Sequence, residues 1–197
     1  MIKGWLNPRH IDDNQPERLL INYRATNDAH YLNLLVAQFN QALYHYVLSQ
    51  SERQLAEDVI QNTWLKVMKS AASYQAKTSV KNWLFSIARN TLIDELRRCN
   101  RWQWQELSEE QPESLELAAS NATPEKIYAE QTRLSAFNQL VDALPFYQRE
   151  AFIFQQEGFS LAEICQLTGE SFETVKSRIR YAKQRLKSQL ELTDERR

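Results

Sequence analysis

The chain has 197 residues, and its 24 basic and 25 acidic residues leave a formal net charge of -1 at pH 7. A composition that is 43% hydrophobic and 25% charged excludes a disordered chain and permits one substantial core or two small ones. Three glycines and five prolines among many Ala, Leu, Glu, Gln and Arg residues exclude a turn-rich β architecture, so we expect an all-α fold with two compact domains.

The cysteines and the apolar runs indicate where the protein works. Cys99 and Cys165 make no CxxC spacing and are too few for a disulfide framework, which indicates a reducing compartment, by default the cytoplasm. No apolar run approaches the roughly 20 residues of a membrane span, so no membrane insertion is expected. The opening stretch MIKGWLNPRHIDDNQPERLL lacks the apolar segment of a signal peptide.

The first half of the chain carries three amphipathic patterns, which we expect to be the helices of a first domain. The first begins near Tyr31. The second begins at Ser51, whose spacing to Gln54 fits a capping box. The third runs over about 79–101. The preceding residues, 1–27, are polar and irregular, and the sequence assigns no role to this N-terminal extension.

The third predicted helix has a polar face that suits unpaired nucleic acid. At about 100° per residue, a set of polar side chains lies within about 80° of arc. They are Ser86, Asn90, Asp94, Arg97 and Arg101. Trp83 falls on the same face and is expected to be exposed, although a lone tryptophan belongs more often to a core. Bases stack on aromatic faces while cations hold the backbone, so this face is a candidate site for single-stranded DNA.

A linker separates the two predicted domains. Five glutamates and no basic residue occur between residues 106 and 116, which is typical of a solvated connection. Thr123 followed by Pro124 then has the form of an N-cap with proline at the first helical position, and Pro145 ends that helix.

A helix-turn-helix pattern follows. Ser160 and Glu163 have the spacing of a capping box that starts a short helix, and Gly169 stands where a tight turn requires positive φ. A longer helix begins near Ser171. The second helix of such an arrangement can enter a DNA major groove.

The longer helix divides into an apolar line and a polar side. The apolar line is Val175, Ile179, Ala182, Leu186 and Leu190. The opposite side, where base edges are reached, carries Glu173, Ser177, Tyr181 and Gln184. Basic residues occupy both flanks, with Lys176, Arg180, Lys183 and Lys187 on one and Arg178 and Arg185 on the other. Two basic flanks around a less charged strip suit phosphate contacts on both walls of a groove, whereas the alternative is a merely solvated surface helix.

Three stretches resemble a known family. ALPFYQREAFIFQQEGFSLAEICQLTGESFETVKSRIRYAKQRL resembles region 4 of bacterial sigma factors of the extracytoplasmic-function group. AEDVIQNTWLKV resembles the segment of that family that binds core RNA polymerase, and NWLFSIARNTLIDELRR resembles its segment that meets the minus-10 element. The resemblance implies two helical domains on a flexible tether: region 2 over 28–101, a linker over 102–122 and a region 4 helix-turn-helix over 123–192.

The resemblance also implies sites and partners. The minus-35 element of promoter DNA would meet Glu173, Lys176, Ser177, Arg178, Arg180, Tyr181 and Lys183. The minus-10 element would meet Trp83, Asn90, Asp94 and Arg97, and a flipped base would enter the 73–80 loop with Tyr74, Gln75, Lys77 and Thr78. Core RNA polymerase would meet Glu57, Asp58, Gln61 and Asn62. An anti-sigma factor is the implied regulator, and no cofactor is implied.

The family pattern is broken at three places: Asn62, Glu170 and the Arg180–Tyr181 pair, where a basic residue is commoner at the second position. Asn62 stands where the family usually has Glu, so a charge-assisted contact with polymerase becomes a neutral hydrogen bond. Glu170 replaces a usual apolar residue at the turn, which leaves the identity of the upstream promoter element open.

Other classes of function fit less well. An enzyme is not expected, because His10, His30 and His45 have no metal-ligand spacing and no Gly-rich phosphate loop exists. A dimeric helix-turn-helix repressor or activator is the main alternative, but its dimerisation helix would need an apolar exposed face, whereas the AEDVIQNTWLKV face is polar. An adaptor that does not bind DNA leaves the basic helix unexplained. The near-neutral charge predicts that the protein alone binds promoters weakly.

Overall fold

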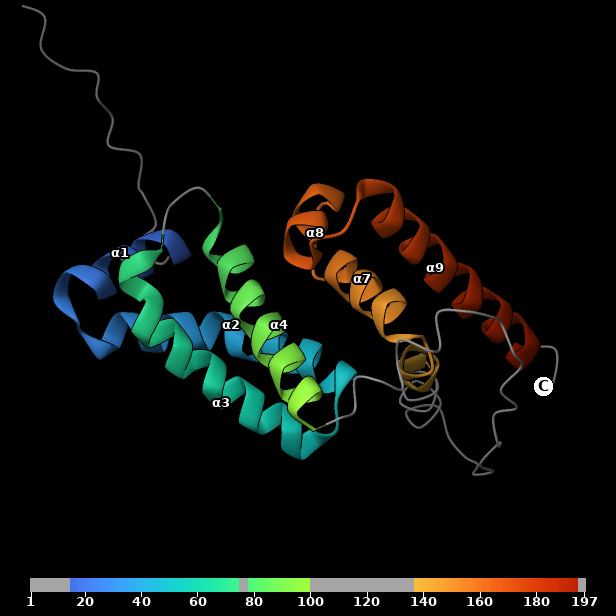
Figure 1. Cartoon of the computed structure of the whole chain (residues 1–197), viewed down its shortest axis with the longest axis horizontal. Coiled ribbons are helices and arrows are strands. Elements are labelled where there is room, and N and C mark those ends of the chain that lie inside the picture. The colour runs from blue at the N-terminus through green and yellow to red at the C-terminus, as the bar shows by residue number, and fades with distance from the viewer. Residues whose placement is uncertain (1–14, 75–77, 100–136, 195–197) are drawn as a thin grey trace, which may run out of the picture.

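The computed structural model describes residues 15–74, 78–99 and 137–194, and within these ranges every regular element is a helix (Figure 1). The all-α prediction is therefore confirmed. The first half comprises α1 (Pro16–Thr26), α2 (Ala29–Gln50), α3 (Arg53–Ser70), a 3-10 turn η1 (Ala71–Ser73) and α4 (Val80–Arg98). The second half comprises α7 (Phe146–Gln156), α8 (Leu161–Thr168) and α9 (Phe172–Asp194). In these ranges no helix is both long enough and apolar enough to cross a membrane.

Helix α1 corrects the expectation of an irregular N-terminal extension. Pro16 occupies the start of the helix, where its missing N–H costs nothing, and Glu17 lies in the first turn. Leu19 and Leu20 are fully buried against the rest of the first half. The helix ends at Asn27, whose positive φ of 54° is a left-handed cap. Residues 16–26 therefore belong to the first helical bundle.

The start of α3 also differs from the prediction. Ser51 does not form a capping box, because its hydroxyl donates to the Val47 carbonyl at 2.9 Å and so serves the end of α2. Helix α3 begins two residues later, after Glu52, whose side chain makes no capping bond. At the start of α4, Ser79 accepts a hydrogen bond from the N–H of Asn82 at 3.1 Å, which confirms the predicted beginning of that helix.

The two halves share one core, although separate cores were expected. Phe85 of α4 lies 4.9 Å from Phe159 and 6.1 Å from Phe154, between ring centroids. Tyr46 of α2 lies 4.7 Å from Phe154. These rings place α7 against α2 and α8 against α4 (Figure 1). Edge and tilted ring contacts of this kind stabilise a fold by more than the apolar area they bury, so the aromatic cluster holds the two halves together.

The predicted acidic linker and the first part of the helix expected between Thr123 and Pro145 lie outside the residues that the structure describes. The last part of that helix is described and is helical over residues 137–142, ending before Pro145 as predicted. A second, smaller core lies between α7, α9 and residues 137–144, and it consists of Leu140, Val141, Leu144, Phe152, Ala182 and Leu186.

Candidate nucleic-acid interface

The helix-turn-helix is built from local signals. Ser160 accepts from the N–H of Glu163 at 3.3 Å, and the Glu163 carboxylate accepts from the N–H of Ser160 at 2.8 Å, which confirms the predicted capping box. The Ser160 hydroxyl also donates to the Glu163 carboxylate at 2.7 Å, and this bond, followed by the one from the Ser160 N–H, lowers the pKa of Glu163. Gly169 has a φ of 76°, as the turn requires, and its N–H donates to the Cys165 carbonyl at 2.8 Å. The turn that sets α8 against α9 is thus fixed by backbone geometry.

Helix α9 buries most of the predicted apolar line. Val175, Ile179, Ala182 and Leu186 are buried. Leu190 is 41% exposed, which corrects its predicted place in the core; the small cluster that α9 joins ends with Leu186. The buried line fixes the rotation of α9 and hence the face that it presents to solvent.

One basic flank of α9 is exposed. Its members are Lys176, Arg180, Lys183 and Lys187. Tyr181, which is 48% exposed, and Glu173 lie beside it on the polar side, and the Arg180 guanidinium lies 4.9 Å from the Tyr181 ring. Long cationic side chains on an exposed helix face can reach phosphate oxygens, so this flank is the candidate contact with duplex DNA.

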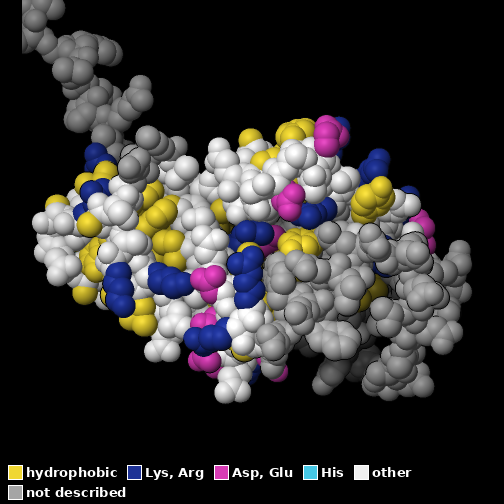
Figure 2. All heavy atoms as spheres, in the orientation of Figure 1, with side chains coloured by type: hydrophobic (Ala, Val, Ile, Leu, Met, Phe, Trp, Pro, Cys, Tyr) yellow, Lys and Arg dark blue, Asp and Glu magenta, His cyan; other side chains and the backbone are white. Residues whose placement is uncertain are grey.

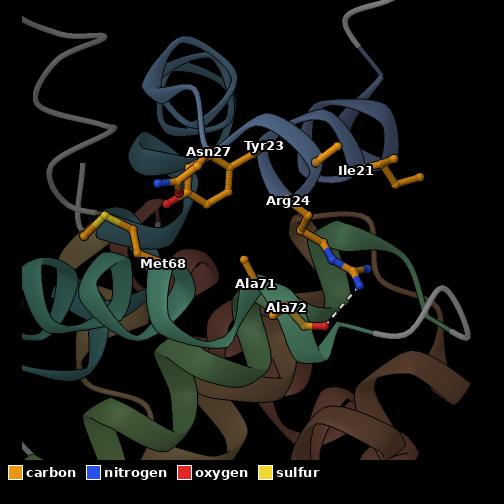
Figure 3. A pocket seen from close by; sticks show the side chains of 8 residues that line it. Ile21, Tyr23, Arg24, Asn27, Met68, Ala71 and Ala72 are labelled. Carbon is orange, nitrogen blue, oxygen red and sulfur yellow. Dashed lines mark hydrogen bonds between the residues drawn. The ribbon is translucent and has the colours of Figure 1, made fainter.

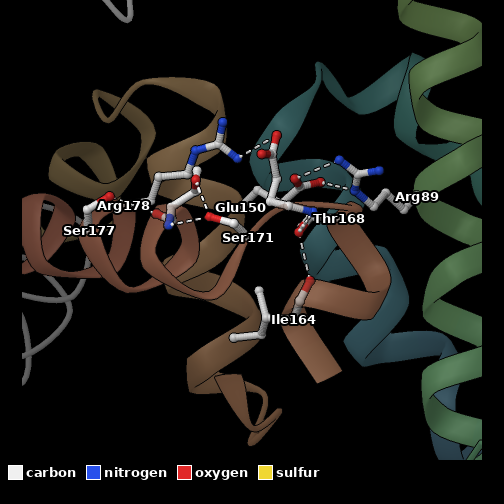
Figure 4. A network of polar contacts seen from close by, with 9 residues as sticks. Arg89, Glu150, Ile164, Thr168, Ser171, Ser177 and Arg178 are labelled. Atoms are coloured by element: carbon white, nitrogen blue, oxygen red, sulfur yellow. Dashed lines mark hydrogen bonds and ion pairs between the residues drawn. The ribbon is translucent and has the colours of Figure 1, made fainter. Parts of the chain in front are cut away.

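On the opposite flank Arg178 and Arg185 are both half-buried, and Arg178 turns away from solvent, which corrects the prediction of two equally exposed basic walls. Arg178 forms an ion pair with Glu170 at 3.2 Å (Figure 4). Its guanidinium lies 4.5 Å from the centroid of the Tyr147 ring. Its side chain is only 14% exposed. Arg178 lies about 60° from Val175 around the helix, close enough to the core for α7 and the turn to cover it. Glu170, the unusual residue of the turn, is therefore the partner of this arginine.

The polar face of α4 is largely exposed as predicted. Asn90, Asp94 and Arg97 all face solvent, and Asp94 pairs with Lys66 of α3 at 3.8 Å. In Figure 2 basic and acidic side chains intermingle over α3 and α4. Trp83 differs from the prediction, because it is half-buried and its ring lies 5.2 Å from that of Tyr74. The face therefore offers amide, carboxylate and guanidinium groups with a partly exposed indole near one end.

The residues predicted to accept a flipped base are only partly accessible. Tyr74 is 5% exposed, and its hydroxyl donates to the Thr78 carbonyl at 2.6 Å. Burial, and then the charge of Glu17, raise the pKa of Tyr74. Its ring is therefore not an open stacking surface in this form. Thr78 is exposed, whereas Gln75 and Lys77 lie outside the described residues.

The predicted polymerase-binding residues share the outer face of α3. Glu57, Asp58 and Gln61 are exposed, and Asn62 is half-buried. Two residues that the sequence reasoning missed extend the α3 surface toward its C-terminus: Leu65 is 42% exposed and Met68 is 40% exposed. The sequence does contain a signal for them, because Leu65 and Met68 lie one and two helical turns after Gln61 and so share its exposed face. The outer surface of α3 thus carries Glu57 and Asp58 near its start, and near its end the apolar Leu65 and Met68 beside Lys66 and Lys69.

A hollow of about 530 Å³ lies between α1 and the end of α3 (Figure 3). It is lined by Ile21, Tyr23, Arg24, Ala25, Asn27, Met68, Ala71 and Ala72. Its one charged lining residue, Arg24, donates to the carbonyl of Ala72 at 3.0 Å. Among the residues that the structure describes, no three His, Cys, Asp or Glu side chains are grouped to hold a metal.

A buried polar cluster joins the two halves, and sequence reasoning missed it. Glu150 of α7 is 1% exposed and accepts from Arg89 Nε at 2.9 Å and from Arg89 Nη2 at 3.1 Å (Figure 4). It also accepts from the Tyr46 hydroxyl at 2.8 Å. Burial alone would lower the pKa of Arg89, but Glu150 more than offsets this and raises it. Burial and the charge of Glu150 raise the pKa of Tyr46 well above its ordinary value.

Further contacts link the first half of the chain to the second. Arg149 Nε donates to Gln50 at 3.1 Å, and Asn82 donates to Gln166 at 3.3 Å. The Lys81 ammonium donates to the carbonyl of Glu157 and lies 4.7 Å from the centroid of the Phe159 ring. The first turn of α4 is therefore held by the second half of the chain.

Comparison with known proteins places both halves in one family. The profile of Sigma-70 region 2 matches residues 35–103, and that of Sigma-70 region 4 matches residues 134–186. The chain is 32% identical to the ECF RNA polymerase sigma factor SigE of Mycolicibacterium smegmatis over 79% of this chain and 60% of that protein. It is 30% identical to the sigma factor EcfG of Rhodopseudomonas palustris over 68% of this chain and 71% of that protein.

A solved structure is also similar. It is the co-crystal structure of the sigma factor RpoE with the anti-sigma factor NepR from Bartonella quintana. The match has a TM-score of 0.60 and 26% identity, and it covers 81% of this chain and 96% of that one.

Proposed function

This chain belongs to the extracytoplasmic-function group of the sigma-70 family, and we propose that it binds core RNA polymerase and directs it to promoters with minus-35 and minus-10 elements. The observation that carries the proposal is that one chain holds both matched regions, each with an exposed polar helix face of the required chemistry. The family is one of transcription regulators, and the protein acts in the cytoplasm beside the polymerase.

Helix α9 is the proposed reader of the minus-35 element. Lys176, Arg180 and Lys183 contact phosphates and fix the register of the helix in the major groove. Side chains that reach base edges are Glu173, Ser177 and Tyr181, which lie between that flank and the far wall of the groove. Arg178 forms an ion pair with Glu170 and a cation–π contact with Tyr147, so its proposed role is to stabilise the packing of the turn and of α7 against α9.

Helix α4 and the residues before it are the proposed site for the minus-10 element. Asn90 and Arg97 contact the separated strand, and the pairing of Asp94 with Lys66 keeps that carboxylate from repelling phosphates. Trp83 supplies the stacking surface. The 73–80 loop accepts the extruded base, with Gln75, Lys77 and Thr78 as its hydrogen-bonding groups.

Helix α3 is the proposed contact with core polymerase. Glu57, Asp58 and Gln61 pair with basic groups, and Asn62 supplies a neutral hydrogen bond. Leu65 and Met68 add an apolar end to the same surface, which suits a helix or groove of the partner with basic and apolar parts. A connection over 102–122 and a region 4 over 123–192 are consistent with separate engagement of polymerase and the two DNA elements, and the region 2 proposed over 28–101 is extended by α1.

Regulation by an anti-sigma factor is part of the proposal. The structure has α2 packed against α7 and α4 packed against α8, so the two DNA-reading surfaces are held on one compact body. Promoter elements that lie apart on the duplex require these halves to separate, and the 102–122 connection spans up to about 70 Å when extended. A partner that stabilises the compact form would keep the protein inactive.

In vitro transcription tests the proposed function. The purified protein is added to sigma-free core polymerase on fragmented genomic DNA of its bacterium, and transcript starts are sequenced. We expect discrete starts that share two spaced upstream elements. The dimeric repressor alternative predicts no new starts and specific operator binding by the protein alone in a gel shift.

A further inference from the structure

Helix α1 holds the beginning of the connection between α3 and α4. Arg24 Nη1 donates to the Tyr74 carbonyl at 3.2 Å, and Arg24 Nη2 donates to the Ala72 carbonyl at 3.0 Å (Figure 3 shows the second bond). Carbonyls at the end of a helix lack partners within it, so they need external donors. A planar guanidinium can donate to two carbonyls in a fixed geometry, which one lysine ammonium does less well.

The same helix holds the end of that connection. Glu17 Oε1 accepts from the N–H of Val80 at 3.1 Å. Val80 is the first residue of α4, so its N–H has no partner within the helix, and a carboxylate at this position also interacts favourably with the helix dipole. Ser79 satisfies the N–H of Asn82 in the same turn.

The spacing of the two anchors is set by a rigid element. Glu17 and Arg24 are seven residues apart in α1, which corresponds to a rise of about 10 Å along the helix. Leu19 and Leu20 lie between them and are fully buried, so α1 cannot slide or rotate without exposing them. Helix α1 therefore fixes the distance between the Tyr74 carbonyl and the first turn of α4.

Between these anchors lies the aromatic pair next to the proposed single-strand face. The Tyr74 ring lies 5.2 Å from the Trp83 ring, and the Tyr74 hydroxyl is tied to the Thr78 carbonyl. Trp83 keeps part of its surface exposed and is seven residues, or about two turns, before Asn90 on α4. A base stacked on Trp83 would rest on an indole whose position depends on the Tyr74 ring behind it.

We propose that Glu17 and Arg24 are positioning residues for recognition of an unpaired DNA base, because Arg24 fixes Tyr74 and Glu17 fixes the first turn of α4, the two segments that carry the Tyr74–Trp83 ring pair. This inference rests on the proposed function of α4. It assigns a role to α1, which the sequence left without one. The ligand class is a nucleobase of the separated strand, stacked on the indole with its backbone held by the α4 face.

The contacts of Arg24 are at the surface, which makes the inference testable without unfolding the protein. Arg24 is exposed, and its bond to Ala72 is exposed as well. Substitution of this exposed arginine therefore removes its hydrogen bonds to the Tyr74 and Ala72 carbonyls, while the buried leucines keep α1 in place. Glu17→Gln is the conservative variant, because its amide oxygen can still accept from the N–H of Val80.

The experiment uses holoenzyme assembled from the full chain and core polymerase. Binding of single-stranded minus-10 oligonucleotides is measured with each of the four bases at every position, for wild type, Arg24→Ala, Glu17→Ala and Glu17→Gln. Ile21→Ala, an exposed residue on the same helix, is the matched control. Affinity for minus-35 duplex and melting temperature are measured in parallel.

We expect Arg24→Ala and Glu17→Ala to lower the preference for the best base at one position by about fivefold or more. This is the smallest loss of affinity expected when one base no longer stacks on an aromatic ring. Glu17→Gln and Ile21→Ala keep the preference, and minus-35 affinity is unchanged. An unchanged preference in Arg24→Ala overturns the inference, as does an equal loss of affinity for all four bases. If wild-type holoenzyme prefers no base at any position, the proposed function of α4 fails and this inference fails with it.

Discussion

Arg89 of α4 and Glu150 of α7 form a two-bond ion pair inside the protein, with Nε 2.9 Å from Oε1 and Nη2 3.1 Å from Oε2. The two residues are 61 positions apart in the chain, and the Glu150 side chain is 1% exposed. Because Arg89 lies in the region 2 match and Glu150 in the region 4 match, this pair joins the polymerase-binding and helix-turn-helix halves. Promoter binding that separates the halves must break it.

Glu150→Ala should open the molecule. Removal of one partner of a buried pair costs about 3–5 kcal/mol, because the remaining charge is left in the interior. Separation of the halves returns Arg89 to water, so we expect opening rather than unfolding. Small-angle X-ray scattering should show a larger radius of gyration with unchanged helicity by circular dichroism. Glu191→Ala, at a 62% exposed side chain, is the control, and an unchanged radius for Glu150→Ala contradicts the expectation.

Tyr46→Phe should change stability at high pH. The raised pKa of Tyr46 means that the folded chain keeps a phenol proton that the unfolded chain loses above about pH 10. The contribution of this group to stability is therefore complete below about pH 10 and is lost as pH rises toward the folded value. At neutral pH the variant loses the bond to Glu150, at a cost of about 1.5–3 kcal/mol.

Denaturant unfolding at several pH values checks this. The free energy of unfolding of wild type should fall between about pH 9 and 11 more steeply than that of Tyr46→Phe, since other tyrosines titrate equally in both. Parallel curves for the two proteins would show that Tyr46 titrates normally in the folded state.

Basic residues of α9 should differ in their effect on DNA binding. Lys176→Ala or Arg180→Ala should each reduce the slope of log affinity against log salt by about 1, because each removes one phosphate contact. Arg178→Ala should leave that slope unchanged and lower the melting temperature, because it loses Glu170 and Tyr147 instead. The measurement is holoenzyme binding to minus-35 duplex over a range of salt concentrations. A reduced slope for Arg178→Ala would return this residue to the DNA interface.

Glu57→Arg should weaken assembly with core polymerase. A reversed charge on the α3 face places like charges together where a charge-assisted contact is proposed, and we expect about a tenfold or larger loss of affinity. Fluorescence anisotropy of labelled protein with core polymerase measures the change. Glu191→Arg makes the same charge change on α9 and should bind core as wild type does. Equal affinities for the two variants would remove α3 from the interface.

Several features that depend on residues three or four positions apart in the sequence were predicted correctly. The Ser160–Glu163 capping box, the left-handed Gly169 and the line from Val175 to Leu186 all follow from spacing and backbone sterics. Exposure of Asn90 and Asp94 on α4 also followed from helical geometry. These features depend on residues close in sequence, whose mutual position a helix fixes.

Features that depend on distant partners were not predictable. Arg178 lies on a flank by its angle alone, and only the neighbouring Tyr147 and Glu170 decide that it faces inward. Ser51 has the sequence spacing of an N-cap, but its hydroxyl donates to the carbonyl of Val47 in the preceding helix instead. Pro16, Glu17 and the adjacent leucines were helix signals in a segment too short and polar to stand out.

The most direct test of the account is site-specific photocrosslinking in holoenzyme bound to one promoter. A benzophenone side chain is placed at Asn90 in one preparation and at Arg180 in another, and the crosslinked nucleotides are mapped. The account predicts crosslinks from position 90 to the separated minus-10 strand and from position 180 to the upstream duplex element of the same promoter. Crosslinks from both positions to one element, or none from position 90 to separated DNA, would contradict the claim that the two halves read two elements.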